Sequence, residues 1–472
     1  MNSASQLQDN KTYHGGARLI VQDVLRDSAL PQLGAVRDES VMTDALERAL
    51  FGAGASFRIE NCTIAYIRYK PGKSCLIHYR VLIRDVKTGE AHLQRLAAKA
   101  LPPVQSGDAY RNARKRDLVL SPLSDPVHHL PDLGLVVWLF PNDSKLEGLP
   151  ALVDKRRLGD SVLPQLSAVA AGPDWHVAGW HTEVVSYVPE RRCTLRAEVR
   201  LKHRVTGESR AETFFGKAYP DHTGRVTFRN MERLYAASGG RSVPLGVARP
   251  LLYKEESKTL WQSAVAGTQL SALEAGGPGL LRFLKDAARG IGALHTFDLE
   301  CGEVSVRERP LEFLIRAGDA LSRRGISCAG LVERLVADAG RLNAPPRATV
   351  HRDLHLDNIF ATEEGIALID LDSLAKGDPA QDLSSLLAHL CSWSLRKGLD
   401  GAQVEPAVWA VVRSYLDAVP WKIGEEEFRW HLAAALIYQQ ASRCIAKPAG
   451  WRLGILEDLV SLAERINRGG TR

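Results

Sequence analysis

The pattern of apolar and polar residues changes character partway along the chain. Residues 59–101 form β-rich segments separated by the turn sequences KPGK and KTGE, which is typical of antiparallel strands. Residues 243–270 read as two further strands with a glycine-containing connection. Beyond them apolar residues recur at helical spacing, in the stretches 279–297, 311–324, 406–419, 428–445 and 454–466. The pattern predicts an α+β protein whose C-terminal half is helical.

The β-rich pattern occurs twice. Without gaps, residues 69–112 align with residues 187–230 at a shift of 118 positions, and twelve residues are identical. The identities include Tyr69 and Tyr187, Cys75 and Cys193, both TGE turns, Lys99 and Lys217, and both RN pairs. We predict an internal duplication of a hairpin, a lysine-bearing strand and a helix. The alternative is two unrelated meanders that share turn chemistry.

The two copies differ at one position of chemical interest. Glu232 follows Lys217 by fifteen residues and lies in the helical stretch 226–238, whereas Arg114 occupies the same place after Lys99. Only the second copy can therefore pair its lysine with a carboxylate at this position.

Composition indicates a globular protein of more than one domain. The chain has 472 residues, 45% of them hydrophobic and 25% charged, and a chain this long usually divides into two or three domains. The net charge of +6 comes from 61 basic and 55 acidic residues spread along the sequence. A dispersed excess of this size favours solubility over nucleic-acid binding.

The cysteines and the N-terminal sequence bear on the compartment. The seven cysteines are scattered and include no C-x-x-C pair, which argues against a disulfide framework or a zinc site. The N-terminal residues 1–16 are polar and lack the apolar core of a secretory signal, and no apolar stretch is long enough for a membrane span. We therefore expect a cytoplasmic protein without membrane contact.

One short segment concentrates polar residues within an apolar frame. VHRDLHLDNIF occupies residues 350–360, and the sequence after it predicts a hairpin with a first strand ending at Phe360, a turn at TEEG and a second strand IALIDL. Such a hairpin would bring Asp353, Asn358 and Asp370 close together.

Their types and spacing suit phosphoryl transfer. An Asp followed five residues later by an Asn, with another Asp after a hairpin, matches the arrangement in which a carboxylate receives a hydroxyl proton and two oxygen ligands hold Mg²⁺. Asp353 takes the first role and Asn358 and Asp370 the second, because Mg²⁺ prefers oxygen ligands. Lys217, paired with Glu232, would contact the α and β phosphates of a nucleotide.

These motifs resemble those of the aminoglycoside phosphotransferase and choline kinase family, which carries H-G-D-x-H-x-x-N, I-D-x-D and G-D-P-x-x-D-L. The corresponding segments here are HRDLHLDN, IDLD and GDPAQDL, and the resemblance spans roughly residues 180–445. It implies a bilobal protein-kinase-like fold and transfer of the ATP γ-phosphoryl group to a hydroxyl of a sugar, amino alcohol or aminoglycoside-like molecule. It also implies Asp353 as catalytic base, Asn358 and Asp370 as Mg²⁺ ligands, Lys217 as phosphate contact, and Asp382 as a buried carboxylate bracing the catalytic loop.

The sequence departs from the family pattern in two ways: Arg352 stands where the family has glycine, and the duplicated strands precede the family segment. An H-R-D triplet also occurs in protein kinases, but only seven residues separate Asp370 from Asp378, which is too few for a peptide-docking segment. We expect His351 and His355 to be structural, and Asp372 either to join the metal site or to cap the following segment.

The resemblance predicts three domains. They are an N-terminal module with a degenerate copy of the small lobe over residues 1–174, a nucleotide-binding small lobe over 175–268 and a helical catalytic lobe over 269–472. No G-x-G-x-x-G precedes Lys217, so backbone amides around Glu190–Arg192 are the candidates for covering the phosphates. Two alternatives stay open: a nucleotide-binding pseudokinase or scaffold acting through the duplicated module, and use of Lys99 in place of Lys217. The sequence leaves the acceptor, the choice of ATP or GTP and the oligomeric state undetermined.

Overall fold

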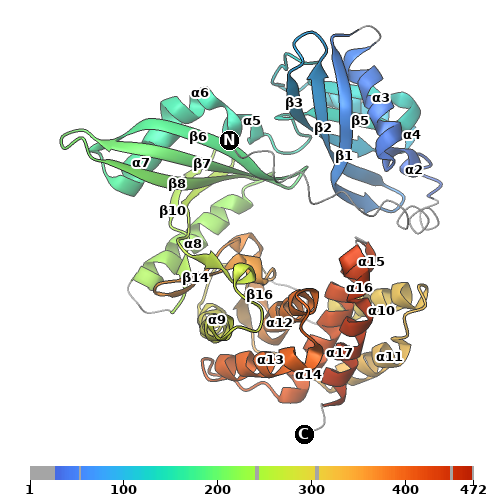
Figure 1. Ribbon diagram of the computed structural model, residues 1–472, viewed down its shortest axis with the longest axis vertical. Coiled ribbons are helices and arrows are strands. Elements are labelled where there is room, and N and C mark those ends of the chain that lie inside the picture. Colours follow the sequence, from blue (N-terminus) through green and yellow to red (C-terminus); the bar gives the residue numbers. More distant parts are fainter. Residues whose placement is uncertain (1–26, 53–54, 240–243, 303–307, 447–449, 470–472) are drawn as a thin grey trace. The chain divides into compact units, whose positions relative to one another are not determined.

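The computed structural model describes residues 27–52, 55–239, 244–302, 308–446 and 450–469. They divide into two compact units. The first, here called the two-sheet unit, comprises residues 27–225 and 251–263, and the second, the helical unit, comprises 226–250 and 264–469. Figure 1 shows strands gathered in the first and helices in the second, which confirms the predicted α+β class.

The first sheet of the two-sheet unit is antiparallel, with the strand order β1-β2-β3-β5-β4. Its hairpin turns at Gly72, whose φ of +67° lies in the left-handed region that glycine adopts without steric cost. The strands are β1 (Phe57–Lys70), β2 (Ser74–Asp85), β3 (Ala91–Ala100), β4 (Val127–Leu130) and β5 (Leu135–Leu139). Helices α2 (Leu33–Val36), α3 (Glu39–Phe51) and α4 (Pro103–Ala113) accompany them.

The second sheet repeats this arrangement with the order β6-β7-β8-β11-β10. Lys99 pairs with Leu76 across β3 and β2, and Lys217 pairs with Thr194, at the shift of 118, across β8 and β7. The strands are β6 (Trp175–Val188), β7 (Arg192–His203), β8 (Ser209–Ala218), β10 (Pro250–Lys254) and β11 (Thr259–Ser263). The helical segments before β6 are α5 (Leu149–Val153), α6 (Lys155–Arg157), a π-helical turn (Leu158–Val162) and α7 (Leu163–Ala171). Helix α8 (Thr223–Gly239) follows β8 and lies mostly in the helical unit. Equal strand order and equal register confirm the duplication.

The duplication extends further upstream than the ungapped alignment shows. Asp27 accepts hydrogen bonds at 2.8 Å from the Tyr69 hydroxyl and from the Gly72 amide. Asp143 accepts the equivalent bonds at 2.7 Å from the Tyr187 hydroxyl and at 3.1 Å from the amide of Glu190, the counterpart of Gly72. In each copy a D-S-x-L segment thus fixes the hairpin turn.

Each sheet is covered by its own helices on one face. Alternate residues of β3 separate the two cores of the unit: Ala98 and Ala100 pack with α2 and α3. Ala97 packs on the opposite face with Leu152 and Leu163 of the second copy. Strand β5 and the adjoining end of β3 are therefore buried on both faces, and the second copy contributes to the core opposite α3.

The helical unit contains the hairpin predicted around the polar segment. Strands β14 (Ile359–Thr362) and β15 (Gly365–Leu368) pair antiparallel, and β12 (Thr268–Gln269) and β9 (Gly246–Val247) extend the sheet. A separate pair joins β13 (Ala348–Val350) to β16 (Ala375–Gly377). The hairpin is confirmed, although its first strand continues past Phe360 to Thr362.

The helices surround these short strands. The five expected helical stretches are present, but the stretch expected over 428–445 is interrupted by a π-helical segment, Leu436–Ala441, here called the π segment. The helices are α9 (Pro278–Thr296), α10 (Glu308–Ser322), α11 (Ala329–Asp338), α12 (Pro379–Arg396), α13 (Gly401–Leu416), α14 (Glu425–Ala435), α15 (Ser442–Ala446), α16 (Gly450–Gly454) and α17 (Leu456–Arg468).

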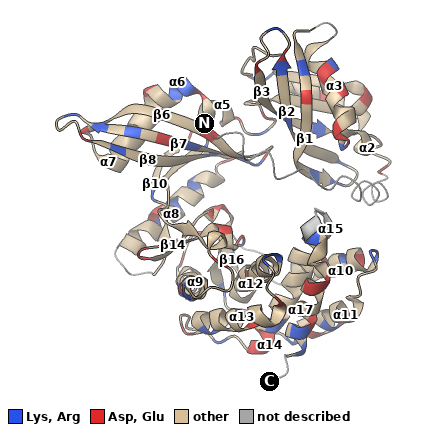
Figure 2. Cartoon of the chain, viewed as in Figure 1, with Lys and Arg blue, Asp and Glu red and all other residues tan. Residues whose placement is uncertain are grey.

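Two surface properties bear on the expected partners. Basic and acidic residues are both spread over the strands and helices of the two units (Figure 2), as the dispersed charge of the sequence predicts. Among the described residues, no helix has both the length and the apolarity that a membrane crossing requires.

Candidate active site in the helical unit

The polar segment forms a loop between β13 and β14, and a buried carboxylate holds its backbone. Asp382 on α12 is 4% exposed. Its side chain accepts hydrogen bonds from the backbone amides of His351, at 2.7 Å, and Arg352, at 2.8 Å. These bonds keep Arg352 at a φ of +67°, a left-handed conformation that costs a non-glycine residue about 1–2 kcal/mol. They explain how an arginine occupies the position of the family's glycine.

A second set of bonds anchors Asp382 itself. His295 on α9 lies with Nε2 3.1 Å from the Asp382 carboxylate and Nδ1 2.8 Å from the Tyr415 hydroxyl. Burial of Asp382 opposes its ionisation, but hydrogen bonds from His295 and from the His351 amide outweigh burial and hold the pKa of Asp382 below its usual value. The loop is thus fixed to α12 by an ionised carboxylate.

The loop is also bonded to the far end of the hairpin. His351 lies with Nε2 3.0 Å from the Ile369 carbonyl and accepts a bond at Nδ1 from the Asp353 amide at 3.3 Å. Asn358 donates from Nδ2 to the Asp353 carbonyl at 3.0 Å, and its own carbonyl accepts from the Ile369 amide at 3.0 Å. Asp353, Asn358 and the residue preceding Asp370 are therefore joined by direct hydrogen bonds.

The side chains of this cluster differ in exposure. Asp353 has about half of its side chain exposed, at 50%, so its carboxylate is accessible from solvent. Asn358 is 6% exposed, and its Oδ1 accepts no hydrogen bond from the described residues. Asp370 is half-buried and adopts a φ of +60°. An amide oxygen without a donor, next to a carboxylate, is a donor set that suits a hard cation such as Mg²⁺.

Asp372 lies in the short 3₁₀ turn Leu371–Ser373, directly after Asp370. Asp378 then caps α12 by accepting from the Ala380 amide at 2.8 Å, and its other oxygen lies 3.3 Å from His431 Nε2. Between these two aspartates, β16 pairs with β13. Six of the seven residues from 371 to 377 are thus in secondary structure, and Leu374 joins the turn to the strand.

Two expected site residues lie in different units. Lys217 is half-buried at the centre of its sheet, between Thr194 on β7 and Leu260 on β11. It belongs to the two-sheet unit, whereas Glu232 lies exposed on α8 in the helical unit.

The turn between β6 and β7 corrects one expectation. The Glu190 amide donates to Asp143, and the Arg191 amide donates to the Val188 carbonyl at 3.1 Å. Both donors are already used within the two-sheet unit, so these two amides are not available to cover phosphates.

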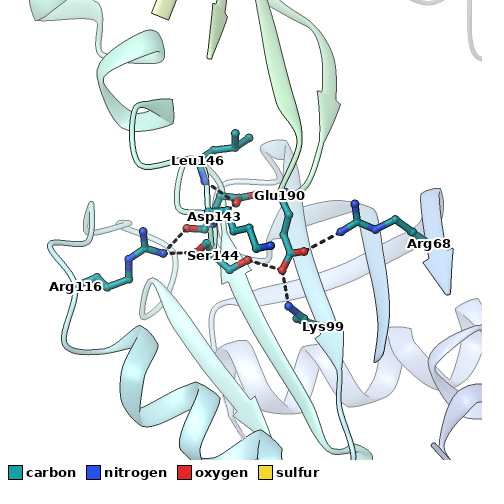
Figure 3. A network of polar contacts seen from close by, with 8 residues as sticks. Arg68, Lys99, Arg116, Asp143, Ser144, Leu146 and Glu190 are labelled. Carbon is teal, nitrogen blue, oxygen red and sulfur yellow. Dashed lines mark hydrogen bonds and ion pairs between the residues drawn. The ribbon is translucent and has the colours of Figure 1, made fainter. Parts of the chain in front are cut away.

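Lys99, the counterpart of Lys217, has a carboxylate partner from the other copy (Figure 3). The Glu190 side chain, 4% exposed, accepts from Lys99 Nζ at 2.6 Å, from Arg68 at 2.8 Å and from the Ser144 hydroxyl at 2.9 Å. Burial of Glu190 opposes ionisation, but its bonds to Lys99 and Ser144 hold its pKa below the usual value. The sequence does not predict this network. Its acceptor, Glu190, aligns with Gly72, which has no side chain, so the first copy gives no indication of a carboxylate at this turn.

A second cluster next to Asp353 also escaped sequence reasoning. Ligand atoms of His355, Asp357 and His389 all lie within 4.8 Å of one another. Hydrogen bonds from His355 and from the Ser271 hydroxyl, at 2.6 Å, hold the pKa of Asp357 well below its usual range. Ser271 and His389 lie outside the quoted motifs, so their proximity depends on the fold. The imidazole-rich set suits Mg²⁺ less well than the oxygen donors of Asn358 and Asp370.

Comparison with known proteins supports the resemblance. Residues 192–415 match the model of a family described as the phosphotransferase enzyme family. This match confirms the resemblance to aminoglycoside phosphotransferases over these residues, which include the loop, the hairpin and α12. No curated protein matches the chain.

Several solved structures are similar at low sequence identity. An amicoumacin kinase has a TM-score of 0.43 and 13% identity, covering 68% of this chain and 95% of its own. A choline kinase from Streptococcus pneumoniae has a TM-score of 0.39 and 11% identity, with coverages of 65% and 98%. An aminoglycoside phosphotransferase from Streptomyces rimosus has a TM-score of 0.34 and 19% identity, with coverages of 58% and 97%.

Proposed function

Because residues 192–415 match the phosphotransferase enzyme family, we propose that the protein transfers the γ-phosphoryl group of ATP to a hydroxyl of a small molecule. The observation that carries the proposal is the bonded loop: Asp353 is exposed to solvent while its backbone is fixed by Asn358 and His351. A base held in this way needs little reorganisation when the reaction begins.

Asp353 is the proposed base. Its carboxylate accepts the proton of the acceptor hydroxyl as the oxygen attacks the γ-phosphorus, and ADP leaves. Asp382 acts through the loop by holding the amides of His351 and Arg352, so it positions Asp353 without touching substrate.

Asn358 and Asp370 are the proposed ligands of Mg²⁺. When bound, Mg²⁺ supplies charge neutralisation for the phosphate oxygens. The free Oδ1 of Asn358 supports this role, since its Nδ2 is committed to the Asp353 carbonyl.

Lys217 is the proposed phosphate contact, with Glu232 as its expected partner. The alternative, Lys99, is tied to Glu190 at 2.6 Å, and its face of the sheet is covered by the second copy. A nucleotide on Lys99 would have to break a buried ion pair, which is costly. This contrast supports the second copy as the nucleotide-binding lobe and a structural role for the first.

A small-molecule acceptor is favoured over a protein. The residues between Asp370 and Asp378 form a 3₁₀ turn and strand β16, which pairs with β13. A peptide acceptor would need an extended docking segment at this point, and six of these seven residues are already in secondary structure.

A screen for acceptor-dependent ADP release tests the proposal. The full-length protein, ATP and Mg²⁺ are incubated with hydroxylated compounds grouped by charge, and the phosphorylated product is identified by mass spectrometry. We expect Asp353→Asn to lower turnover at least about a hundredfold, the usual contribution of a positioned base, while ATP binding persists. Lys217→Met should weaken ATP binding more than Lys99→Met does. Equal weakening by both would contradict the assignment of the lobes.

A further inference from the structure

A small cavity lies close to the proposed base in the helical unit. It has a volume of about 120 Å³ and opens between α12, the π segment, α15 and α16. Its lining residues are His389, Ser392, Trp393, Arg396, Gln440, Arg443, Cys444 and Arg452. Three of the eight are arginines, and none of the described lining residues carries a carboxylate.

One buried polar group in the wall lacks a partner among the described residues. Trp393 is 3% exposed and its Nε1–H, although buried, has no acceptor in the described structure. Gln440, 5% exposed, also lines the cavity. Buried polar groups are nearly always bonded, so the Trp393 Nε1–H beside the cavity indicates a ligand that accepts a hydrogen bond. Gln440 lies in the π segment. Because π-helical turns are frequent at functional sites, this position also supports a ligand-binding role for the cavity.

The cavity is connected to Asp353 through two histidines. His389 in the wall has its ring centre 5.3 Å from that of His355. His355 Nε2 in turn lies 4.0 Å from the Asp353 carboxylate. The Leu356 amide donates to His389 Nδ1 at 3.4 Å, which ties the catalytic loop to the cavity wall. The cavity wall is therefore separated from the proposed base by the two histidine side chains.

The charged residues in the cavity lining favour an anionic ligand. Burial lowers the pKa of His389 to about 4, and the nearby charges of His355, Arg443 and Arg396 add to this effect. Guanidinium groups bind carboxylate and phosphate oxygens through paired, charge-assisted hydrogen bonds. An ammonium group in the same place would find no carboxylate among the described lining residues to pair with. The cavity thus disfavours a polycationic acceptor.

We propose that this cavity binds an anionic group, a carboxylate or a phosphate ester, of the hydroxylated acceptor. Arg443 and Gln440 are the specificity-determining residues, and Asp353 receives the proton of a hydroxyl at the other end of the same molecule. The inference rests on the proposed function, because it names the substrate class of that site.

Matched acceptors test the substrate class. Gluconate and glucose 6-phosphate represent the two anions, glucitol the neutral form and glucosamine the cationic form, all offered to the full-length protein with ATP and Mg²⁺. We expect kcat/KM for at least one anion to exceed that for glucitol and glucosamine by about tenfold or more, the effect of one charge-assisted hydrogen bond. A preference for glucosamine or equal use of all four would overturn the inference.

Substitutions of cavity residues test whether the preference for an anion arises in this cavity. Arg443→Gln should raise KM for the preferred anion about tenfold or more with little change in kcat, because the lost contact is far from the reacting atoms. Gln440→Leu should act in the same direction. Arg334→Gln is the matched control, since Arg334 is an exposed arginine of α11 outside the cavity. An unchanged KM in Arg443→Gln would overturn the inference.

A binding measurement separates this inference from the proposed function. Calorimetry with inorganic phosphate and with gluconate, without ATP, should show binding that Arg443→Gln weakens and Arg334→Gln does not. If anions bind in this way but no compound is phosphorylated, the anion site stands and the proposed function fails. If phosphorylation occurs but anions bind wild type and Arg443→Gln alike, the function stands and the anion site fails.

Discussion

At the scale of single residues, the loop of the candidate site is held by the buried carboxylate of Asp382. Asp382 is buried, ionised and bonded to the amides of His351 and Arg352 and to His295. An isolated charge in this position would be unstable, and three donors make it tolerable. The same bonds allow Arg352 to adopt a left-handed backbone.

Removing this carboxylate should destabilise the helical unit. Asp382→Ala leaves two backbone amides and His295 without an acceptor, so the free energy of unfolding should fall by about 3–5 kcal/mol, the usual effect of breaking a buried ionic contact. Urea unfolding followed by tryptophan fluorescence measures the change. Asp319→Ala, an exposed residue of α10, is the control and should change stability by less than about 0.5 kcal/mol. Equal stability of both variants would contradict the bracing role.

His78 predicts a dependence of stability on pH. It is 5% exposed on β2 with its ring 5.0 Å from that of Tyr187, and burial lowers its pKa to about 4. The unfolded chain takes up a proton below about pH 6.5 and the folded chain does not, so stability should fall as the pH drops from about 6.5 toward 4. At pH 5 the loss from this residue should be about 2 kcal/mol. Urea unfolding at pH 7 and pH 5 should show a smaller pH effect in His78→Phe, and an identical effect would contradict the account.

The sequence identifies the residues on the loop but not those packed against it. Asp353, Asn358 and Asp370 stand out because their spacing is local and a hairpin is easily recognised. His389 and Ser271 do not, because they reach the loop from α12 and from a segment 86 residues before Asp357. Such contacts follow from tertiary packing, which residue spacing alone does not encode.

At the scale of elements, the two duplicated sheets differ at one hairpin turn. The first copy has Gly72 at its hairpin and the second has Glu190, both with positive φ. The Glu190 carboxylate reaches Lys99 and Arg68 of the first copy. Lys99, which aligns with Lys217, thus links the first copy to the second.

Removing Lys99 should show how far the stability of the two-sheet unit depends on its ion pair with Glu190. Lys99→Met leaves the buried Glu190 carboxylate with fewer donors, so we expect the two-sheet unit to lose about 3 kcal/mol or more of unfolding free energy. The double variant Lys99→Met, Glu190→Gln should recover part of the loss, because the uncompensated charge is removed. Lys87→Met, in an exposed turn of the same sheet, should change little. A double variant as unstable as the sum of its parts would contradict the coupling.

The ungapped alignment reveals the duplicated strands but not their full extent. Asp27 precedes Tyr69 by 42 residues, and Asp143 precedes Tyr187 by 44. Because of this difference of two residues, the D-S-x-L segments do not align at the shift of 118 positions that aligns the strands. The π segment is likewise hidden, because its residues continue the apolar periodicity of α14 and one extra residue per turn leaves little trace in the sequence.

At the scale of the whole molecule, the two units have distinct proposed tasks. The two-sheet unit carries one lysine held in an internal ion pair and a second, Lys217, proposed for the nucleotide. The helical unit carries the bonded loop and the arginine-lined cavity. The family resemblance predicts the nucleotide-contacting role of Lys217. It does not predict the arginine-lined cavity, because the lining residues come together only when the helices pack.

The central claim is that Asp353 receives the acceptor proton during phosphoryl transfer. The most direct test measures the γ-phosphoryl group itself: ³¹P magnetic resonance of the full-length protein with ATP, Mg²⁺ and an acceptor found by the screen, comparing wild type with Asp353→Asn. The account predicts a phosphate ester in the wild type, and formation slower by about a hundredfold or more in the variant, with ATP affinity unchanged in both. Equal rates of ester formation in the two proteins would contradict it.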